Sequence, residues 1–172
     1  MIRRSTSVAL AGVLVFGLVS CARASGPTTP PALHYTDNKL QICVPTSTHP
    51  DLAVGIRVDP QGNEPITIKS IETVDASGLR VDGAWVVPAD PDNRIGSADW
   101  PITDGESWWS KRQQAKEAKL FPGQYHDLIL HVHHTGSGSG SLRDVKIKYE
   151  QGGEPRVADA YTGVRMATGV CE

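Results

Sequence analysis

The chain has 172 residues, of which 39% are hydrophobic and 21% charged, and its formal net charge is −2 at pH 7. It contains no dense run of Lys or Arg, so the composition gives no support to nucleic-acid binding. A chain of this length can form one hydrophobic core but not two.

Residues 1–20 have the pattern of an export signal. Arg3 and Arg4 form a basic start, and residues 8–20 form an uncharged, mainly apolar run. That run is too short for a helix that spans a membrane, which needs about 20 residues, and it fits the hydrophobic region of a signal peptide. Removal of this segment would change the formal net charge to −4.

The segment ends in Leu18-Val19-Ser20-Cys21, which resembles the lipobox of bacterial lipoproteins. The resemblance implies cleavage before Cys21, attachment of acyl chains such as palmitate to that cysteine, and a mature protein anchored to the extracytoplasmic side of the cell membrane. Each buried CH₂ contributes roughly 0.8 kcal/mol, and two or more acyl chains hold a protein stably on a bilayer. The alternative is an ordinary cleaved signal peptide in which Cys21 is incidental.

A short tether follows the lipobox. Residues 22–31 are rich in Pro, Ser and Thr, which predicts a flexible segment without a core. With Cys21 as the lipidated residue, the tether covers 21–32, and the folded domain covers 33–172.

The three cysteines predict one disulfide. If Cys21 is lipidated, Cys43 and Cys171 remain as a pair in an oxidising compartment. One lies near the start of the domain and the other at its end, so we expect a bond that joins the first strand to the last. Neither belongs to a Cys-x-x-Cys motif, so redox catalysis has no support.

Alternating apolar residues predict an all-β domain. Gly, Pro and Asp turns separate the segments, and about seven strands suggest an immunoglobulin-like antiparallel β-sandwich. A slip near Lys69-Ser70 predicts a β-bulge. In one segment Leu79, Val81, Trp85 and Val87 are expected on one face. The predicted strands lie within 40–44, 52–58, 66–73, 79–87, 128–133, 144–149 and 161–170.

The stretch 120–149 is predicted to form a β-hairpin. Its limbs would be 128–133 and 144–149, joined by the Gly/Ser run 136–141. Leu and Val alternate with His in the first limb, so the histidines are expected on the outer face. The lysines of the second limb would then lie beside them.

His131 and His133 form the clearest chemical motif. On a strand their Cα atoms are about 6.6 Å apart on one face, and two imidazoles can converge on a metal ion with N–metal distances of about 2.1 Å. Asp127 lies on the same face and His126 near the strand end, and either would complete the site. The sequence leaves two interpretations: a solvated strand face that carries His by chance, which we favour, and a zinc or copper site. No other cofactor is expected.

Residues 90–119, here called the insertion, interrupt the strand pattern. The segment 106–119 contains good helix formers and no Gly or Pro, which predicts a short helix. With Trp85, the insertion brings together four tryptophans. They are predicted to cap one end of the core; if they are exposed instead, Trp100, Trp108 and Trp109 form a surface for an envelope protein or glycan.

The sequence predicts no enzyme. It lacks a Gly-x-Ser-x-Gly elbow, a phosphate-loop ending and an EF-hand pattern. We therefore expect a membrane-anchored, non-catalytic binding or envelope-accessory module, with a metal-binding lipoprotein as the alternative.

Overall fold

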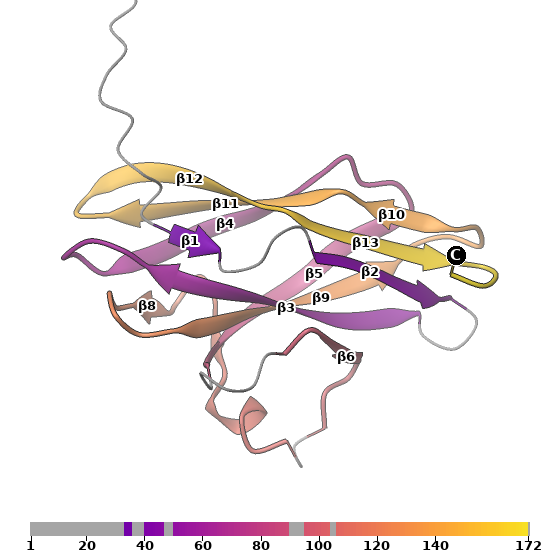
Figure 1. Cartoon of the computed structure of the whole chain (residues 1–172), viewed down its shortest axis with the longest axis horizontal. Helices are drawn as coiled ribbons and strands as arrows, with labels where there is room; N and C mark the ends of the chain where they lie inside the picture. Colours follow the sequence, from indigo (N-terminus) through magenta and orange to yellow (C-terminus); the bar gives the residue numbers. More distant parts are fainter. Residues whose placement is uncertain (1–32, 36–39, 47–49, 90–94, 104–105, 172) are drawn as a thin grey trace, which may run out of the picture.

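The computed structural model describes residues 33–171 except 36–39, 47–49, 90–94 and 104–105. These residues form β-sheets that face each other and enclose one main hydrophobic core (Figure 1). In the described ranges the one helical element is a 3-10 turn, η1 (Trp109–Lys111). The predicted all-β sandwich is confirmed.

The first sheet carries the histidine motif. Its order is β1-β3-β9-β5-β7, with β6 paired to β3, and all pairs are antiparallel. The central strand is β9, which pairs with β3 on one side and with β5 on the other. The strands are β1 (Leu33–Tyr35), β3 (Asp51–Pro60), β5 (Leu79–Pro88), β6 (Ser97–Asp99), β7 (Gln113–Gln114) and β9 (His126–His134).

The opposite layer is built on one long hairpin. Its first limb contains β10 and β11, and its second contains β12 and β13. β11 pairs with β12 next to the turn at Gly152-Gly153, and β10 pairs with β13 farther along the limbs. At one end β4 and β8 extend the layer, and at the other end β2 joins β13 in parallel. The strands are β2 (Leu40–Pro45), β4 (Ile66–Val74), β8 (Lys119–Leu120), β10 (Gly140–Leu142), β11 (Asp144–Gln151), β12 (Glu154–Ala160) and β13 (Thr162–Ala167).

The main core lies between these layers. Alternate residues of β3 and β9 face Val145, Ile147 and Tyr149 of β11, all of which are at most 1% exposed. Full burial of a side chain of this size contributes roughly 1.5–3 kcal/mol. The described residues form thirteen strands instead of about seven. Each limb of the long hairpin is divided into two strands, and several strands of two or three residues pair at the sheet edges. The predicted bulge is present, since Lys69 has no partner in the β4–β11 register.

The predicted hairpin 120–149 is wrong. β9 pairs with β3 and β5 in the first sheet, whereas β11 pairs with β4 and β12 in the opposite layer. The Gly/Ser run therefore carries the chain from one layer to the other. The lysines of β11 do not lie beside the histidines of β9, because the alternating pattern identifies a strand but not its neighbour.

The predicted short helix is also wrong. The segment contains the turn η1, and then Gln113–Gln114 pairs with β5 and Lys119–Leu120 pairs with β4. The two short strands pair with the sheet edges, and the backbone bonds within the segment form only single turns, such as that from the Ala118 N–H to the Gln114 carbonyl at 3.1 Å. Tertiary pairing has outweighed the helix propensity of the segment.

A β-bulge in β5 changes the direction of its side chains. Leu79 and Val81 pack in the main core as predicted, but Trp85 and Val87 pack on the opposite face. The register shifts between Val81 and Gly83, and one extra residue moves all later side chains to the other side of the sheet.

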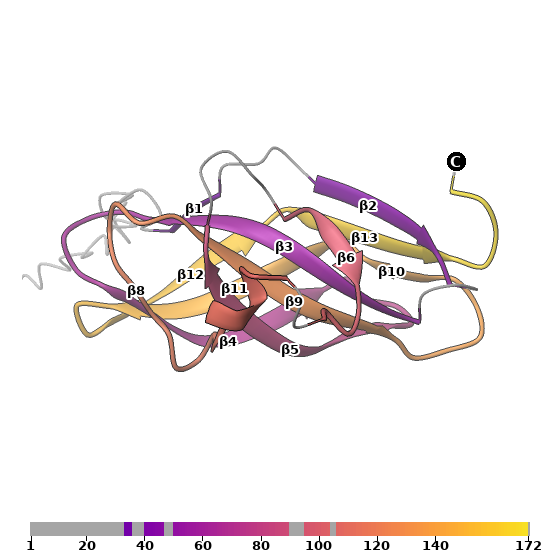
Figure 2. The ribbon, with the colours of Figure 1, turned by 90° about the horizontal axis from the view of Figure 1, so that it is seen from below.

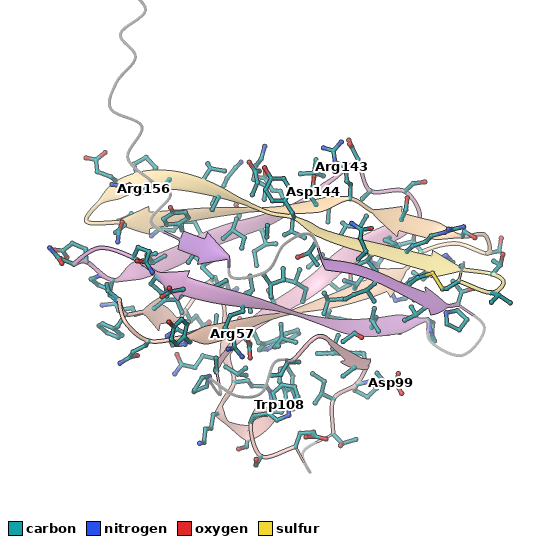
Figure 3. The ribbon with its side chains drawn as sticks, viewed as in Figure 1. Arg57, Asp99, Trp108, Arg143, Asp144 and Arg156 are labelled. Atoms are coloured by element: carbon teal, nitrogen blue, oxygen red, sulfur yellow. A yellow bond between two sulfur atoms is a disulfide. The ribbon has the colours of Figure 1, made fainter. Side chains whose placement is uncertain are left out.

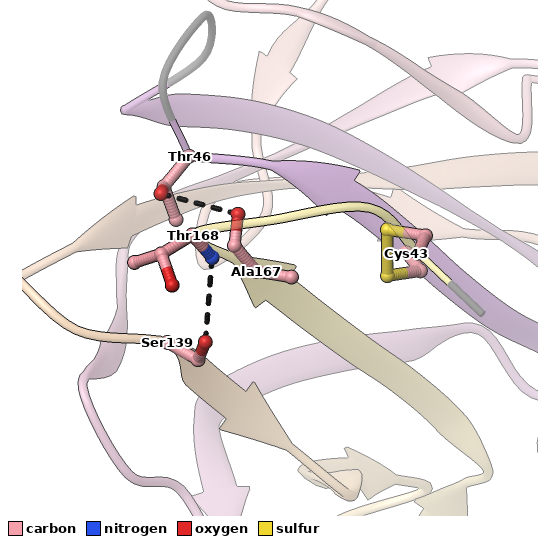
Figure 4. Close-up of a disulfide and its surroundings, with 6 residues drawn as sticks. Cys43, Thr46, Ser139, Ala167 and Thr168 are labelled. Carbon is pink, nitrogen blue, oxygen red and sulfur yellow. Dashed lines mark hydrogen bonds between the residues drawn. A yellow bond between two sulfur atoms is a disulfide. The ribbon is translucent and has the colours of Figure 1, made fainter.

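A disulfide joins Cys43 of β2 to Cys171, which follows β13, with 5.8 Å between the Cα atoms (Figure 4). The predicted pairing is therefore present, although β1 precedes β2 in the chain. Hydrogen bonds tie the same region together: Thr46 Oγ1 donates to the Ala167 carbonyl at 3.2 Å, and the Thr168 N–H donates to Ser139 Oγ at 3.3 Å. The disulfide thus links the middle of β2 to the segment that follows β13.

Candidate functional site

The insertion covers the outer face of the first sheet. Figure 2 shows β6 and η1 on the side of β3 and β9 that faces away from the opposite layer. The backbone of the insertion approaches β3 at Gly55, whose N–H donates to the Gly96 carbonyl at 3.0 Å. A Cβ atom on Gly55 would lie 1.9 Å from the Ile95 oxygen, so the absence of a side chain permits this contact.

The four tryptophans form a second cluster under the insertion. Trp85 stacks on Trp100 with 5.1 Å between ring centroids, and Trp109 lies edge-on to Trp85, Trp100 and Trp108 at 5.6–5.8 Å. Trp109 is buried, and the other three are partly exposed. The tryptophans therefore pack on a sheet face instead of capping one end of the core.

Trp108 lies at the outer limit of this cluster. Figure 3 shows it within the insertion, away from Arg143 and Asp144 at the opposite edge of the molecule. Its Nε1–H donates to the Glu106 carboxylate at 3.0 Å. The guanidinium of Arg112 lies 4.8 Å from the Trp109 ring centroid, a cation–π contact. The insertion thus presents indole edges together with charged groups.

The two histidines of the motif lie beside this cluster and share a carboxylate. His131 Nε2 and His133 Nδ1 are each 2.7 Å from Asp51 Oδ1. The side chain of His131 is 15% exposed, that of His133 is 30% exposed and that of Asp51 is 25% exposed. Asp51 comes from β3, where it is the cross-strand partner of His133. The ring of His131 stacks on Trp100 with 4.2 Å between centroids and 12° between planes.

A charged pair on β5 borders the same face. Arg80 Nε donates to Asp82 Oδ1 at 2.5 Å. That hydrogen bond lowers the pKa of Asp82, and the charges of His131 and His133 lower it further. The pKa of Asp51 is also lowered: burial acts to raise it, but the hydrogen bonds to His133 and His131 together outweigh burial. Both carboxylates are therefore ionised at neutral pH.

Asp127 and His126 do not belong to this cluster. Asp127 shares the face of His131 as predicted, but it is 1% exposed and forms an ion pair with Arg57, Nε to Oδ1 at 2.7 Å. His126 has both ring nitrogens buried without a hydrogen-bond partner, and burial lowers its pKa, with Asp127 acting in the opposite direction. The expectation that either residue completes a site with the histidines is therefore wrong.

Asp51 is the residue that sequence reasoning missed. It begins a clearly alternating strand, but 80 residues separate it from His131. Only the antiparallel pairing of β3 with β9 brings them together. A search for carboxylates at the ends of the other predicted strands would have included Asp51 among many candidates.

A groove of about 350 Å³ opens between β4 and β5, next to the tryptophans. Apolar side chains of both strands line it, and its charged lining residues are Lys69, Asp82 and Lys116. Trp85 lines the groove and also stacks on Trp100, so it belongs both to the groove and to the tryptophan cluster.

Comparisons with known proteins add little to this site. No family model matches the chain, and no curated protein matches it significantly. Among solved structures, the chain is similar to the VesB protease of Vibrio cholerae, with a TM-score of 0.41 and 10% sequence identity. The similarity covers 80% of this chain and 32% of the protease chain, so this chain spans about a third of that structure. A similarity at this level carries no argument about activity.

The described residues contain no helix that is long and apolar enough to cross a membrane. Cys21 and the segment before it lie outside the described residues, and so does the tether.

Proposed function

We propose that this protein is a membrane-anchored, extracytoplasmic lipoprotein that acts as a non-catalytic binding or envelope-accessory module. The anchor is Cys21, at the end of the lipobox-like sequence Leu18-Val19-Ser20-Cys21. The Cys43–Cys171 disulfide supports the location, because such bonds persist in oxidising compartments. The binding surface is the insertion on the outer face of the first sheet.

The aromatic insertion is the observation that carries the binding role. A sheet face could be covered by aliphatic side chains alone, but here three tryptophans remain partly exposed around the buried Trp109. Indole rings beside acidic and basic groups suit a partner with both apolar and polar faces, such as a glycan or an envelope protein. Trp108 is the expected point of contact, with Glu106 bonded to its indole N–H and Arg112 over the ring of the neighbouring Trp109.

The anchor is tested by the substitution Cys21→Ser. We expect the unaltered protein to incorporate labelled palmitate and to fractionate with membranes, and the variant to lose both properties because it has no acyl chain. Equal labelling and equal fractionation of the two proteins would exclude the anchor.

The binding role is tested with isolated cell envelopes from cells that lack the protein. Purified protein should bind them saturably, and Trp108→Ala should weaken binding by about tenfold or more, as expected for an aromatic hot spot. Tyr161→Ala is the matched control, because Tyr161 is an aromatic residue that is 56% exposed and lies between β12 and β13. Protease or glycosidase treatment of the envelopes would separate a protein partner from a glycan. Equal effects of the two substitutions would argue against the insertion as the binding surface.

A further inference from the structure

Asp51, His131 and His133 bring two imidazole nitrogens and one carboxylate oxygen together on the outer face of the first sheet. We propose that they form a site for a divalent transition-metal ion of the zinc or copper type. The inference needs neither the membrane anchor nor a macromolecular partner, so it goes beyond the proposed function.

The backbone places these side chains without any loop. His131 and His133 are two residues apart on β9 and therefore point to the same face. Asp51 lies directly across from His133 in the antiparallel register. Both imidazoles approach the same oxygen, Asp51 Oδ1, at 2.7 Å. Sites built on paired strands hold their ligands more precisely than sites on loops.

The type of donor indicates the type of ion. Two imidazole nitrogens and one carboxylate oxygen suit Zn²⁺, Cu²⁺ or Ni²⁺, whereas Ca²⁺ and Mg²⁺ prefer oxygen ligands alone. Three protein ligands leave a fourth position for water or for a group of a partner. The exposed fractions of 15–30% for these side chains give an ion a route from solvent.

In the structure both imidazoles are hydrogen-bonded to Asp51. Within the described ranges no three or more His, Cys, Asp or Glu side chains are already arranged to hold an ion. A tetrahedral ion with bonds of about 2.1 Å separates its ligand atoms by roughly 3.4 Å, so the 2.7 Å contacts must lengthen. A neutral imidazole can move its proton to the other ring nitrogen, and the nitrogen that faces Asp51 then presents a lone pair to the ion.

Neighbouring residues support the ligands. Trp100 stacks on His131 and limits the rotation of its ring, as outer partners of metal-binding histidines do. Asp82 contributes negative charge from β5, and its pKa responds to both imidazoles. Arg80 is the nearby cation that would repel an ion, but it is paired with Asp82 at 2.5 Å. An ion at this site would therefore lie beside the carboxylates of Asp51 and Asp82, with the charge of Arg80 balanced by Asp82.

The test is a calorimetric titration of the full chain, purified in detergent with its disulfide intact, with Zn²⁺ and separately with Cu²⁺. We expect one ion per chain, and affinity reduced by about tenfold or more in each of Asp51→Asn, His131→Gln and His133→Gln, since each removes one ligand. His126→Gln and His134→Gln are matched controls at the two ends of β9, outside the cluster, and they should bind as the unaltered protein does.

A spectroscopic measurement on the unaltered protein does not depend on how the variants fold. Electron paramagnetic resonance of the Cu²⁺ form should show coupling to two imidazole nitrogens, and the copper should quench tryptophan fluorescence because Trp100 touches His131. Absence of binding, binding that the three ligand substitutions leave unchanged, or a spectrum without nitrogen coupling would each overturn the proposal. Envelope binding that persists in a chelator would show that the proposed function stands even if the metal site fails.

Discussion

Arg57 and Asp127 form a buried ion pair beneath the insertion. Their side chains are 5% and 2% exposed, and two contacts join them: Nε to Oδ1 at 2.7 Å and Nη2 to Oδ2 at 3.3 Å. Removal of one partner from such a pair is costly, because the remaining charge stays buried and loses this ion pair. Asp127 is thus a structural residue, although its place on the histidine face first suggested a ligand.

We expect Asp127→Asn to lower the free energy of unfolding by about 3 kcal/mol, measured by urea denaturation. Glu72→Gln is the control, because Glu72 pairs with Lys148 at the surface, where both side chains are nearly half exposed. An exposed pair contributes about 1 kcal/mol or less. Similar losses in the two variants would contradict the structural role of Asp127.

His126 predicts a pH dependence. Burial lowers its pKa in the folded protein, so the unfolded chain binds the proton more readily, with a pKa of about 6.5. The free energy of unfolding should therefore fall as the pH decreases through 6.5, and the loss should end once the pH is below the folded-state pKa.

The variant His126→Gln should lose stability less steeply between pH 7.5 and pH 5 than the unaltered protein. The measurement is urea denaturation at a series of pH values. His134→Gln controls for the other histidine at the far end of β9. An identical pH profile for His126→Gln and the unaltered protein would mean that His126 titrates alike in the folded and unfolded states.

At the scale of the element, the insertion depends on Gly55. A Cβ atom there would lie 1.9 Å from the Ile95 oxygen, so Gly55→Ala must displace the insertion from β3. Steric insertion of this kind costs roughly 1–3 kcal/mol, and we expect a red shift of the tryptophan emission as water reaches the cluster. Gly96→Ala is the control, since nothing lies within 4 Å of its Cβ position. Unchanged emission in Gly55→Ala would show that the insertion tolerates the added methyl group.

Period-two alternation correctly predicted most of the individual strands, because it depends only on which side of a strand is buried. It could not predict their neighbours: Ile129 and Ile147 have similar patterns but lie in different layers. The bulge between Val81 and Gly83 also escaped prediction, and with it the outward direction of Trp85. For the same reason the candidate site was predicted only in part. The sequence identified the two histidines of β9 but not Asp51 of the adjacent strand β3.

At the scale of the whole molecule, the disulfide closes a loop that contains almost the entire domain. Cys43 and Cys171 are 128 residues apart, and in the chain-entropy model such a loop contributes about 5 kcal/mol as an upper estimate. The lipobox resemblance and the cysteine count together predicted this bond, since its two ends are the cysteines that remain if Cys21 is lipidated.

The double variant Cys43→Ser/Cys171→Ser should be less stable by about 2–5 kcal/mol in urea denaturation. The β2–β13 pair lies beside the bond. Its amide protons should therefore show the largest increase in exchange rate when the variant is compared with the unaltered protein. Reduction of the unaltered protein with dithiothreitol should reproduce both effects. Equal stability with and without the bond would mean that the strands alone hold this end of the sandwich.

The position of the disulfide also determines what happens after proteolytic damage. A single cut anywhere between Cys43 and Cys171 leaves two fragments that are still joined by a covalent bond. If Cys21 holds the protein on the membrane, a nicked molecule keeps both pieces attached to that membrane, and they separate on an electrophoresis gel only after reduction.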